Sequence, residues 1–224
     1  MTNFVLVPDK KQVAPTSASK QRDYILLDRS PSMVENERWE EALAGVNAYI
    51  SKLATGGVDT KVTVAVFDCE YEVVRRDVAP SSCTPITKDD VALGGGTALN
   101  DAIHHLVTQA KADNPQRAAI IIATDGEDNS SKMKTGQAHA LLTQCRLRGW
   151  QVIFLGIDHD NARLAQQYGA SPREVIATGK ESIVALMAKV AEKRAAHSQS
   201  GTAISFTDAE KKTAGSKLPL TRRS

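Results

Sequence analysis

Three short apolar runs, of which the third is interrupted only by Gln151 and Gly156, are the feature that most constrains how this chain folds. They span Tyr24–Leu27, Ala118–Ala123 and Trp150–Ile157, and an aspartate follows each within two residues. Short runs without polar alternation are typical of parallel strands that are covered on both faces. Because amphipathic helical patterns separate the runs, we predict an α/β fold with a doubly wound, mostly parallel sheet and helices on both faces.

The helices are predicted from apolar residues that recur three or four positions apart. Asn36 and Thr97 are the expected N-caps of the first two helices. The sequence Thr178–Glu181 has the spacing of a capping box ahead of the last helix. The predicted helices cover residues 37–54, 97–110, 138–145, 161–168 and 180–196.

A hairpin is predicted at one edge of the sheet. Lys61–Phe67 and Tyr71–Val78 are separated only by the tight turn Asp68–Glu70, so they would pair antiparallel. Charged residues on the second of these strands suit an edge that must resist pairing with other chains. A last short strand is predicted at Glu174–Ala177.

The chain length and composition predict one domain with two tails. The 224 residues include 42% hydrophobic and 24% charged residues, which is ordinary for a globular domain. We assign residues 1–20 to a flexible N-terminal arm, 21–196 to the folded domain and 197–224 to a polar C-terminal tail. A net charge of +2 carries no electrostatic signature of nucleic-acid binding.

The expected setting is the cytoplasm. The sequence has no apolar run of about 18 or more residues, so no transmembrane helix is predicted. The first twenty residues lack the pattern of a signal peptide. The scattered residues Cys69, Cys83 and Cys145 fit reduced thiols better than a disulfide framework.

Oxygen donors lie where the predicted strands end. Asp28, Ser30 and Ser32 follow the first apolar run, Thr97 follows three glycines, and Asp125 follows the second run. In parallel sheets, ligands bind beyond the carboxyl ends of the strands. We therefore expect these five side chains to meet around one divalent cation. Magnesium prefers such oxygen ligands, and manganese or calcium would also suit them.

The arrangement resembles the metal-ion-dependent adhesion site of von Willebrand factor type A domains. The shared pattern is D-x-S-x-S at Asp28–Ser32, a glycine-rich loop that ends in Thr97, and T-D-G at Thr124–Gly126. The resemblance covers roughly residues 21–196. One departure is Pro31, which stands where glycine is common in the family and stiffens the loop without removing a ligand.

The resemblance implies a function and roles for the site residues. Ser30 and Ser32 would bind the metal directly, and Asp28, Asp125 and Thr97 would bind directly or through water. A Glu or Asp from a protein partner would complete the coordination. Such members act beside AAA-type ATPases or within larger assemblies, which include phage or virion components. In related adhesion domains, changes at the metal accompany a slide of the last helix, here Lys180–Ala196.

Several alternatives stay open from the sequence. The aspartates and serines of the site have a purely structural interpretation as helix caps and turns. A structural or assembly role without metal is one alternative function, and a metal-dependent hydrolase is another. No general base beside a nucleophile is evident, so we expect no enzymatic activity. His104, His105, Asp128 and Asp158–Asp160 are further candidates near the site.

Overall fold

The strands of the described residues form one sheet in the order β3-β2-β1-β4-β5-β6. All neighbours pair in parallel except β3, which runs antiparallel to β2. The computed structural model describes residues 21–33, 38–157, 161–178 and 182–215. The strands are β1 (Gln21–Asp28), β2 (Lys61–Phe67), β3 (Tyr71–Val78), β4 (Arg117–Thr124), β5 (Gln151–Gly156) and β6 (Val175–Ala177).

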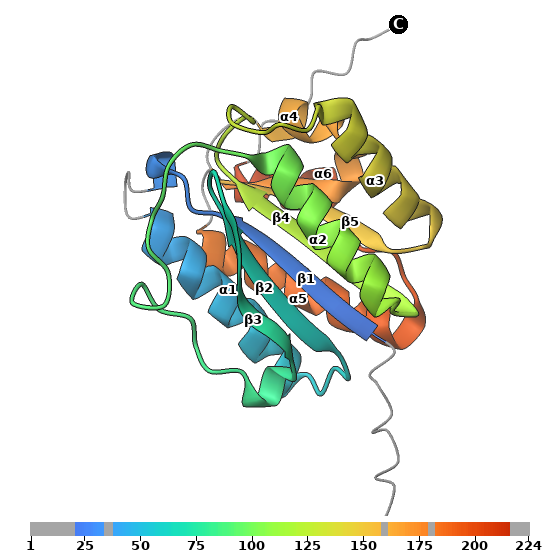
Figure 1. The fold of residues 1–224 in the computed structure, drawn as a ribbon. Helices are drawn as coiled ribbons and strands as arrows, with labels where there is room; N and C mark the ends of the chain where they lie inside the picture. The colour runs from blue at the N-terminus through green and yellow to red at the C-terminus, as the bar shows by residue number, and fades with distance from the viewer. Residues whose placement is uncertain (1–20, 34–37, 158–160, 179–181, 216–224) are drawn as a thin grey trace, which may run out of the picture.

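Helices cover both faces of the sheet, as the sequence predicts. Figure 1 shows α2 on one side of the sheet and α1 and α5 on the other. The helices are α1 (Arg38–Thr55), α2 (Leu99–Asp113), α3 (Thr135–Leu147), α4 (Asn161–Gln167), α5 (Ile183–Ser200) and α6 (Asp208–Ala214). None of these helices is long and apolar enough to cross a membrane.

Alternate residues of the central strand β1 supply the two hydrophobic cores. Ile25 and Leu27 pack with α1 and α5, whereas Tyr24 and Leu26 pack with α2 and α3. All four side chains are at most 1% exposed. This two-sided burial explains why the strand reads as an unbroken apolar run. The fold is therefore the doubly wound α/β architecture that the sequence predicts, with β3 as its one antiparallel edge strand.

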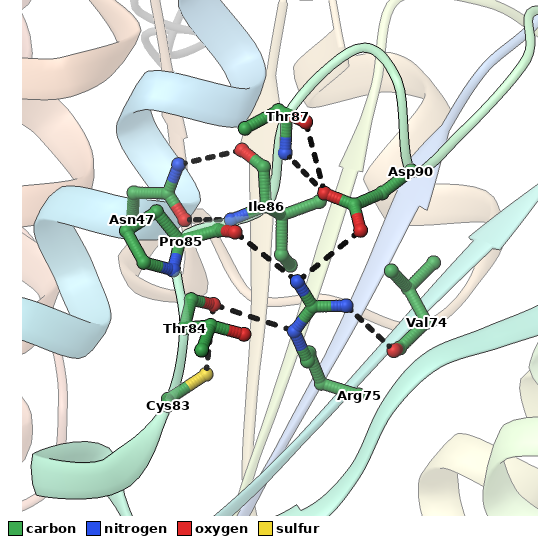
Figure 2. A network of polar contacts seen from close by, with 9 residues as sticks. All are labelled: Asn47, Val74, Arg75, Cys83, Thr84, Pro85, Ile86, Thr87 and Asp90. Carbon is green, nitrogen blue, oxygen red and sulfur yellow. Dashed lines mark hydrogen bonds and ion pairs between the residues drawn. The ribbon is translucent and has the colours of Figure 1, made fainter.

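The long connection from β3 to α2 is tied to its neighbours before it reaches the glycine-rich loop (Figure 2). Asn47 of α1 exchanges two hydrogen bonds of 2.8 Å with the backbone of Ile86. Arg75 of β3 donates to the carbonyl oxygens of Thr84 and Pro85 and lies 3.5 Å from Asp90. These contacts anchor an otherwise irregular segment, so the loop that follows begins from a defined position.

The C-terminal part of the chain differs from the prediction. The boundary expected at residue 196 falls inside α5, which ends at Ser200. Ile204, Phe206 and Ala214 then pack into the core beside α1 and α5. Thr207 caps α6 in a capping box with Glu210. Residues 197–214 thus continue the folded structure, because a few apolar side chains in a polar stretch suffice to dock it.

The start of α5 also differs from the prediction. Ser182 is its N-cap, and the Ser182 hydroxyl accepts a hydrogen bond from the backbone N–H of Ala185. The helix therefore begins three residues later than the expected Lys180. The capping-box sequence extends into residues 179–181, which lie outside the described residues. The predicted arm 1–20, the cap Asn36 and the candidates Asp158–Asp160 lie outside them as well.

A buried ion pair joins β1 to α5. The Arg194 Nε atom lies 2.7 Å from Asp23 Oδ1, and both side chains are fully buried. The other Asp23 oxygen accepts a hydrogen bond of 3.0 Å from the Tyr49 hydroxyl of α1. A slide of α5 by one turn would separate Arg194 from Asp23 and leave two unpaired buried charges. In this structure the pair ties α5 to β1, and the slide of the last helix that the family resemblance implies stays a prediction.

Replacing Arg194 with Met is expected to lower the free energy of unfolding by about 3–5 kcal/mol, because Asp23 would remain buried without its cation. Urea unfolding at neutral pH measures this change. Glu192→Ala is the matched control on the same helix, since its partner Lys52 is half exposed. The control should cost no more than about 0.5–1 kcal/mol. Equal losses in both variants would contradict a special role for the buried pair.

Candidate metal site

The predicted site residues come from three loops at one edge of the sheet. Asp28 is the last residue of β1, and Asp125 directly follows β4. Thr97 lies two residues before α2. The register pairs Leu27 with Ala123, so β1 and β4 end almost level with each other. The sheet therefore delivers both aspartates to the same edge.

Hydrogen bonds link the first and third of these loops. The hydroxyl oxygens of Ser30 and Ser32 lie 3.0 Å apart. The Ser32 hydroxyl donates to Asp125 Oδ1 at 2.8 Å. Residues 93 positions apart in the chain thus place their oxygens within hydrogen-bonding distance. The predicted convergence of Ser30, Ser32 and Asp125 is present in the structure.

Asp28 is fully buried beneath this chain of hydroxyls. Its Oδ1 accepts from the backbone N–H of Ser30 at 2.8 Å, and its Oδ2 accepts from the Thr124 hydroxyl at 2.6 Å. Burial raises the pKa of Asp28 to about 6, and the charge of Asp125 also raises it, while the hydrogen bonds from Thr124 and Ser30 oppose the rise. The neutral donors therefore do not fully compensate the buried charge.

Thr97 is held against the third loop through its backbone. Its N–H donates to Asn129 Oδ1 at 2.8 Å, and its carbonyl oxygen accepts from the Asn129 N–H at 2.9 Å. The Thr97 hydroxyl lies 3.8 Å from where a Cβ on Gly126 would be. Since Gly126 follows Asp125, the Thr97 side chain reaches the loop that carries the second carboxylate.

The donor set suits a hard divalent cation. It offers two carboxylates and three hydroxyls, all of them oxygen ligands of the kind that magnesium prefers. Among the described residues, no three His, Cys, Asp or Glu side chains gather in a way that would hold a metal. The hydroxyl groups therefore distinguish this candidate site from a carboxylate or thiolate cluster.

The sequence matches the family model of the von Willebrand factor type A domain over residues 24–189. This chain belongs to that family. No curated protein matches the sequence. Among solved structures, proximal thread matrix protein 1 from the mussel byssus is similar at 18% identity with a TM-score of 0.55, covering 77% of this chain and 46% of that one.

Two further structures show the same fold. VWA2, an ArnB paralog from Sulfolobus acidocaldarius, has 16% identity and a TM-score of 0.56, with 80% of this chain and 46% of that chain covered. The PilB minor pilin from Streptococcus sanguinis has 12% identity and a TM-score of 0.61, with 81% of this chain and 63% of that chain covered. This chain thus spans less than half of the mussel and archaeal chains, and the likeness concerns the domain fold.

The glycine-rich loop of this von Willebrand factor type A (VWA) domain packs too closely for side chains. A Cβ on Gly94 would lie 1.3 Å from Asp68 Oδ2, and one on Gly96 would lie 2.1 Å from the Ser130 hydroxyl. Arg29 holds Asp68 in place at 3.3 Å. Glycine is required at both positions by this close approach rather than by an unusual backbone conformation.

The prediction that Thr97 caps α2 is wrong. The N-cap is Ala98, which has no side chain that can cap. The free N–H groups are satisfied from the third loop instead, because Asp128 accepts from the Asn100 N–H at 2.9 Å and Ser131 from the Asp101 N–H at 3.1 Å. Asp128, a candidate from the sequence, therefore caps a helix and braces the loop beside Asp125.

The sequence argument missed two side chains that shape the site. Thr124 supplies the hydroxyl that bonds Asp28, and the T-D-G motif contained it as a signal. Arg38, the first residue of α1, places Nη1 3.5 Å from Asp125 Oδ2 and 3.3 Å from the Ser32 carbonyl oxygen. No motif marked Arg38, because only the tertiary structure brings the start of α1 beside the β4–α3 loop.

The two histidines do not contact the described oxygen cluster. The His105 ring stacks on Tyr71 of β3 with centroids 5.3 Å apart, and the His104 ring meets His105 edge to face. His105 and Tyr71 line a cleft of about 390 Å³ together with Cys69 and Ser130. The cleft adjoins the glycine-rich loop, since Cys69 and Ser130 also lie against Gly96.

Gly94→Ala should unfold the glycine-rich loop or displace Asp68, and we expect a loss of about 2–4 kcal/mol in the free energy of unfolding. Gly136→Ala is the matched control, because a Cβ there meets nothing within 4 Å and the residue lies in α3. The control should gain about 0.4–1 kcal/mol. Thermal or urea unfolding of both variants measures the difference, and a stable Gly94→Ala variant would contradict the packing argument.

Asp28→Asn tests the buried charge without metal. The folded-state pKa of about 6 exceeds the ordinary value of 3.8, so this group stabilises the fold below pH 4 and loses that contribution as pH rises through 6. In chelator at pH 7.5, the neutral variant should therefore be more stable than wild type by about 1–2 kcal/mol.

The measurement is urea unfolding of both proteins at pH 4.5 and 7.5. The stability advantage of Asp28→Asn should shrink at the lower pH, where wild-type Asp28 is protonated. Asp89→Asn, at an exposed position, is the control for the loss of one negative charge. An advantage for Asp28→Asn that does not change with pH would show that ionisation of Asp28 does not destabilise the fold.

Proposed function

We propose that this VWA domain binds a divalent cation, with Mg²⁺ as the expected ion, through Asp28, Ser30, Ser32, Thr97 and Asp125. The bound cation would then bind a Glu or Asp of a protein partner. The observation that carries this proposal is the hydrogen-bonded chain from Ser30 through Ser32 to Asp125, which gathers oxygen ligands from two loops.

The electrostatics of Asp28 support a cation at this position. Its described hydrogen-bond partners are the hydroxyls of Thr124 and Ser30 and the backbone N–H of Ser30, none of which carries charge. A divalent cation would stabilise the ionised carboxylate and also relieve its repulsion with Asp125. Because hydroxyl ligands add no negative charge, a cation held in this way keeps affinity for a further carboxylate. That remaining affinity is the physical basis for recognising an acidic residue.

Partner binding agrees with the family and with the kinds of protein that share the fold. VWA domains are protein-interaction and assembly modules. The similar structures include a minor pilin and a thread matrix protein. We propose a protein partner for this chain on that basis, with an AAA-type ATPase or a component of a larger assembly, such as a virion, as the candidate classes. The three free cysteines fit a reducing, cytoplasmic setting.

A binding role also fits the contacts of the serines better than a catalytic one. The Ser30 hydroxyl contacts the Ser32 hydroxyl and the Asp28 carboxylate, and the Ser32 hydroxyl contacts Ser30 and Asp125. A serine nucleophile is typically activated by a histidine or lysine base within hydrogen-bond reach. We therefore propose that the domain is not an enzyme. An assembly role that uses the fold without metal is the second candidate, favoured by the thread and pilus relatives.

Asp125→Asn should weaken Mg²⁺ binding by at least about tenfold, because the amide removes the negative charge from a ligand. Glu127→Gln is the matched control, since Glu127 is exposed in the same loop and the substitution removes the same charge. Isothermal titration with Mg²⁺ should show wild-type affinity for the control. Equal affinities for all three proteins, or no binding by wild type, would contradict the proposed site.

Partner capture should depend on both the metal and Asp125. The immobilised domain is incubated with extract from the source organism in Mg²⁺ and again in chelator, beside the Asp125→Asn and Glu127→Gln domains. A protein retained by wild type and Glu127→Gln only in Mg²⁺ is the expected partner, and replacing its contacting Glu or Asp with Ala should release it. If the partner is retained equally in chelator and by the Asp125→Asn domain, the result would instead favour the assembly role without metal.

A further inference from the structure

A buried histidine joins the last turn of α5 to the segment that follows the helix. The Nδ1 atom of His197 lies 2.9 Å from the carbonyl oxygen of Thr202. A carbonyl oxygen only accepts hydrogen bonds, so in the neutral ring Nδ1 carries the hydrogen and Nε2 carries none. Nε2 is buried and has no hydrogen-bond partner in the described part of the chain. A neutral histidine of one tautomer therefore satisfies the contact with Thr202.

The charged groups around the ring disfavour a positive charge on it. Arg194 lies one turn earlier on α5 and is fully buried. Arg117 of β4 donates to the carbonyl oxygen of Ser198, the residue after the histidine. The acidic group nearby is Asp23 of β1, and it is already paired with Arg194 at 2.7 Å. A proton on Nε2 would thus bring a further cation into a buried place that already holds one.

The pKa of His197 reflects these surroundings. Burial lowers this pKa below its ordinary value of 6.5, and the charges of Arg194 and Arg117 lower it further. The hydrogen bond to Thr202 and the charge of Asp23 oppose the change without reversing it. The loss of hydration is therefore the main reason why the ring stays neutral.

Residues 201–214, here called the C-terminal strap, run from the end of α5 to the starts of β5 and β6. The N–H of Ile204 donates to Gln151 Oε1 at 2.9 Å, and the N–H of Phe206 donates to the Arg173 carbonyl oxygen at 2.9 Å. Both side chains pack into the core, within a stretch that is otherwise polar or small. A segment docked by so little apolar area should open more readily than the whole domain unfolds.

We propose that His197 is a pH-sensitive latch, which holds the C-terminal strap on the domain when the ring is neutral and releases the strap when Nε2 is protonated. The proton comes from solvent and creates a buried N–H without a partner, next to Arg194. Release of the strap removes the Thr202 carbonyl and lets water solvate the ring and screen the arginine. The latch lies at the starts of the strands, opposite the proposed metal site, and does not depend on a metal.

The direction of the pH dependence follows from the two states of the strap. The pKa of His197 is below 6.5 in the docked strap and returns to the ordinary value on release. The released state then binds more protons, so docking is most stable above pH 6.5 and weakens as pH falls below it. The strap residue Glu210 pairs with Lys193 of α5, and its lowered pKa keeps it ionised from pH 5.5 upward.

Nuclear magnetic resonance of the full chain in chelator tests the latch at the ring itself. The ¹⁵N shifts of the His197 imidazole should show the Nδ1–H tautomer at pH 7.5 and a pKa below 6.5. The Nε2–H tautomer, or a pKa at or above 6.5, would overturn the proposal. Either result would mean that the buried ring does not resist protonation in the docked strap.

Hydrogen exchange of the Ile204 and Phe206 amides measures release of the strap. After correction for the intrinsic exchange rate, their opening constant should rise about five- to tenfold between pH 7.5 and 5.5. The amide of Ile121 in β4 reports opening of the whole domain and should show no such rise. Asp28 acts on the whole domain in the opposite direction, because its pKa is raised to about 6. Unchanged protection of both strap amides over this range overturns the latch.

His197→Asn identifies the group responsible. The Asn side chain can donate from the position of Nδ1 but takes up no proton, so the opening constant of its strap should not change with pH. A constant that is raised at pH 7.5 and flat with pH still supports the latch, because the lost bond and the lost titration both belong to His197. His139→Asn, on α3, is the matched control and should respond as wild type does. A wild-type response in His197→Asn would assign the pH dependence to another group and overturn the proposal.

Discussion

A buried carboxylate needs either a cation or a proton, and the central strand of this domain carries two such groups. Asp23 and Asp28 lie five residues apart in β1, and both are fully buried. Asp23 is paired with Arg194, whereas the described partners of Asp28 are uncharged. The first pair binds the last helix to the sheet. The charge of Asp28 is not neutralised by a described cation, and Asp28 lies at the edge of the sheet where the loops meet.

The loops around Asp28 are held by contacts that do not use the side chains of the proposed ligands. Asp128 and Ser131 cap α2, and Asn129 binds the backbone of Thr97. Arg29 holds Asp68 against the glycine-rich loop. In metal sites generally, such supporting contacts hold the ligands in position and so reduce the cost of ordering them when an ion binds. The site is therefore built by its neighbours as much as by the five residues of the motif.

Much of the fold could be predicted from the sequence, because strands buried on both faces must be continuously apolar. The runs at Tyr24–Leu27 and Ala118–Ala123 became neighbouring central strands for this reason. The ends of α5 and the docking of residues 201–214 could not be predicted. A polar stretch with isolated apolar residues such as Ile204 and Phe206 has no helical or strand periodicity. These residues become buried only because the folded domain presents a hydrophobic surface on which they pack.

The sequence by itself determined the fold class and the oxygen donors at the strand ends, since both follow from local residue order and from the geometry of parallel sheets. The glycine-rich loop was also evident from the sequence, but the close approach of Asp68 and Ser130 that requires Gly94 and Gly96 was not. Only the tertiary structure decided which groups compensate each charge. Pairings such as Arg194 with Asp23 and Arg38 with Asp125 join residues 171 and 87 positions apart. Those contacts depend on how helices pack over the sheet, which no local pattern encodes.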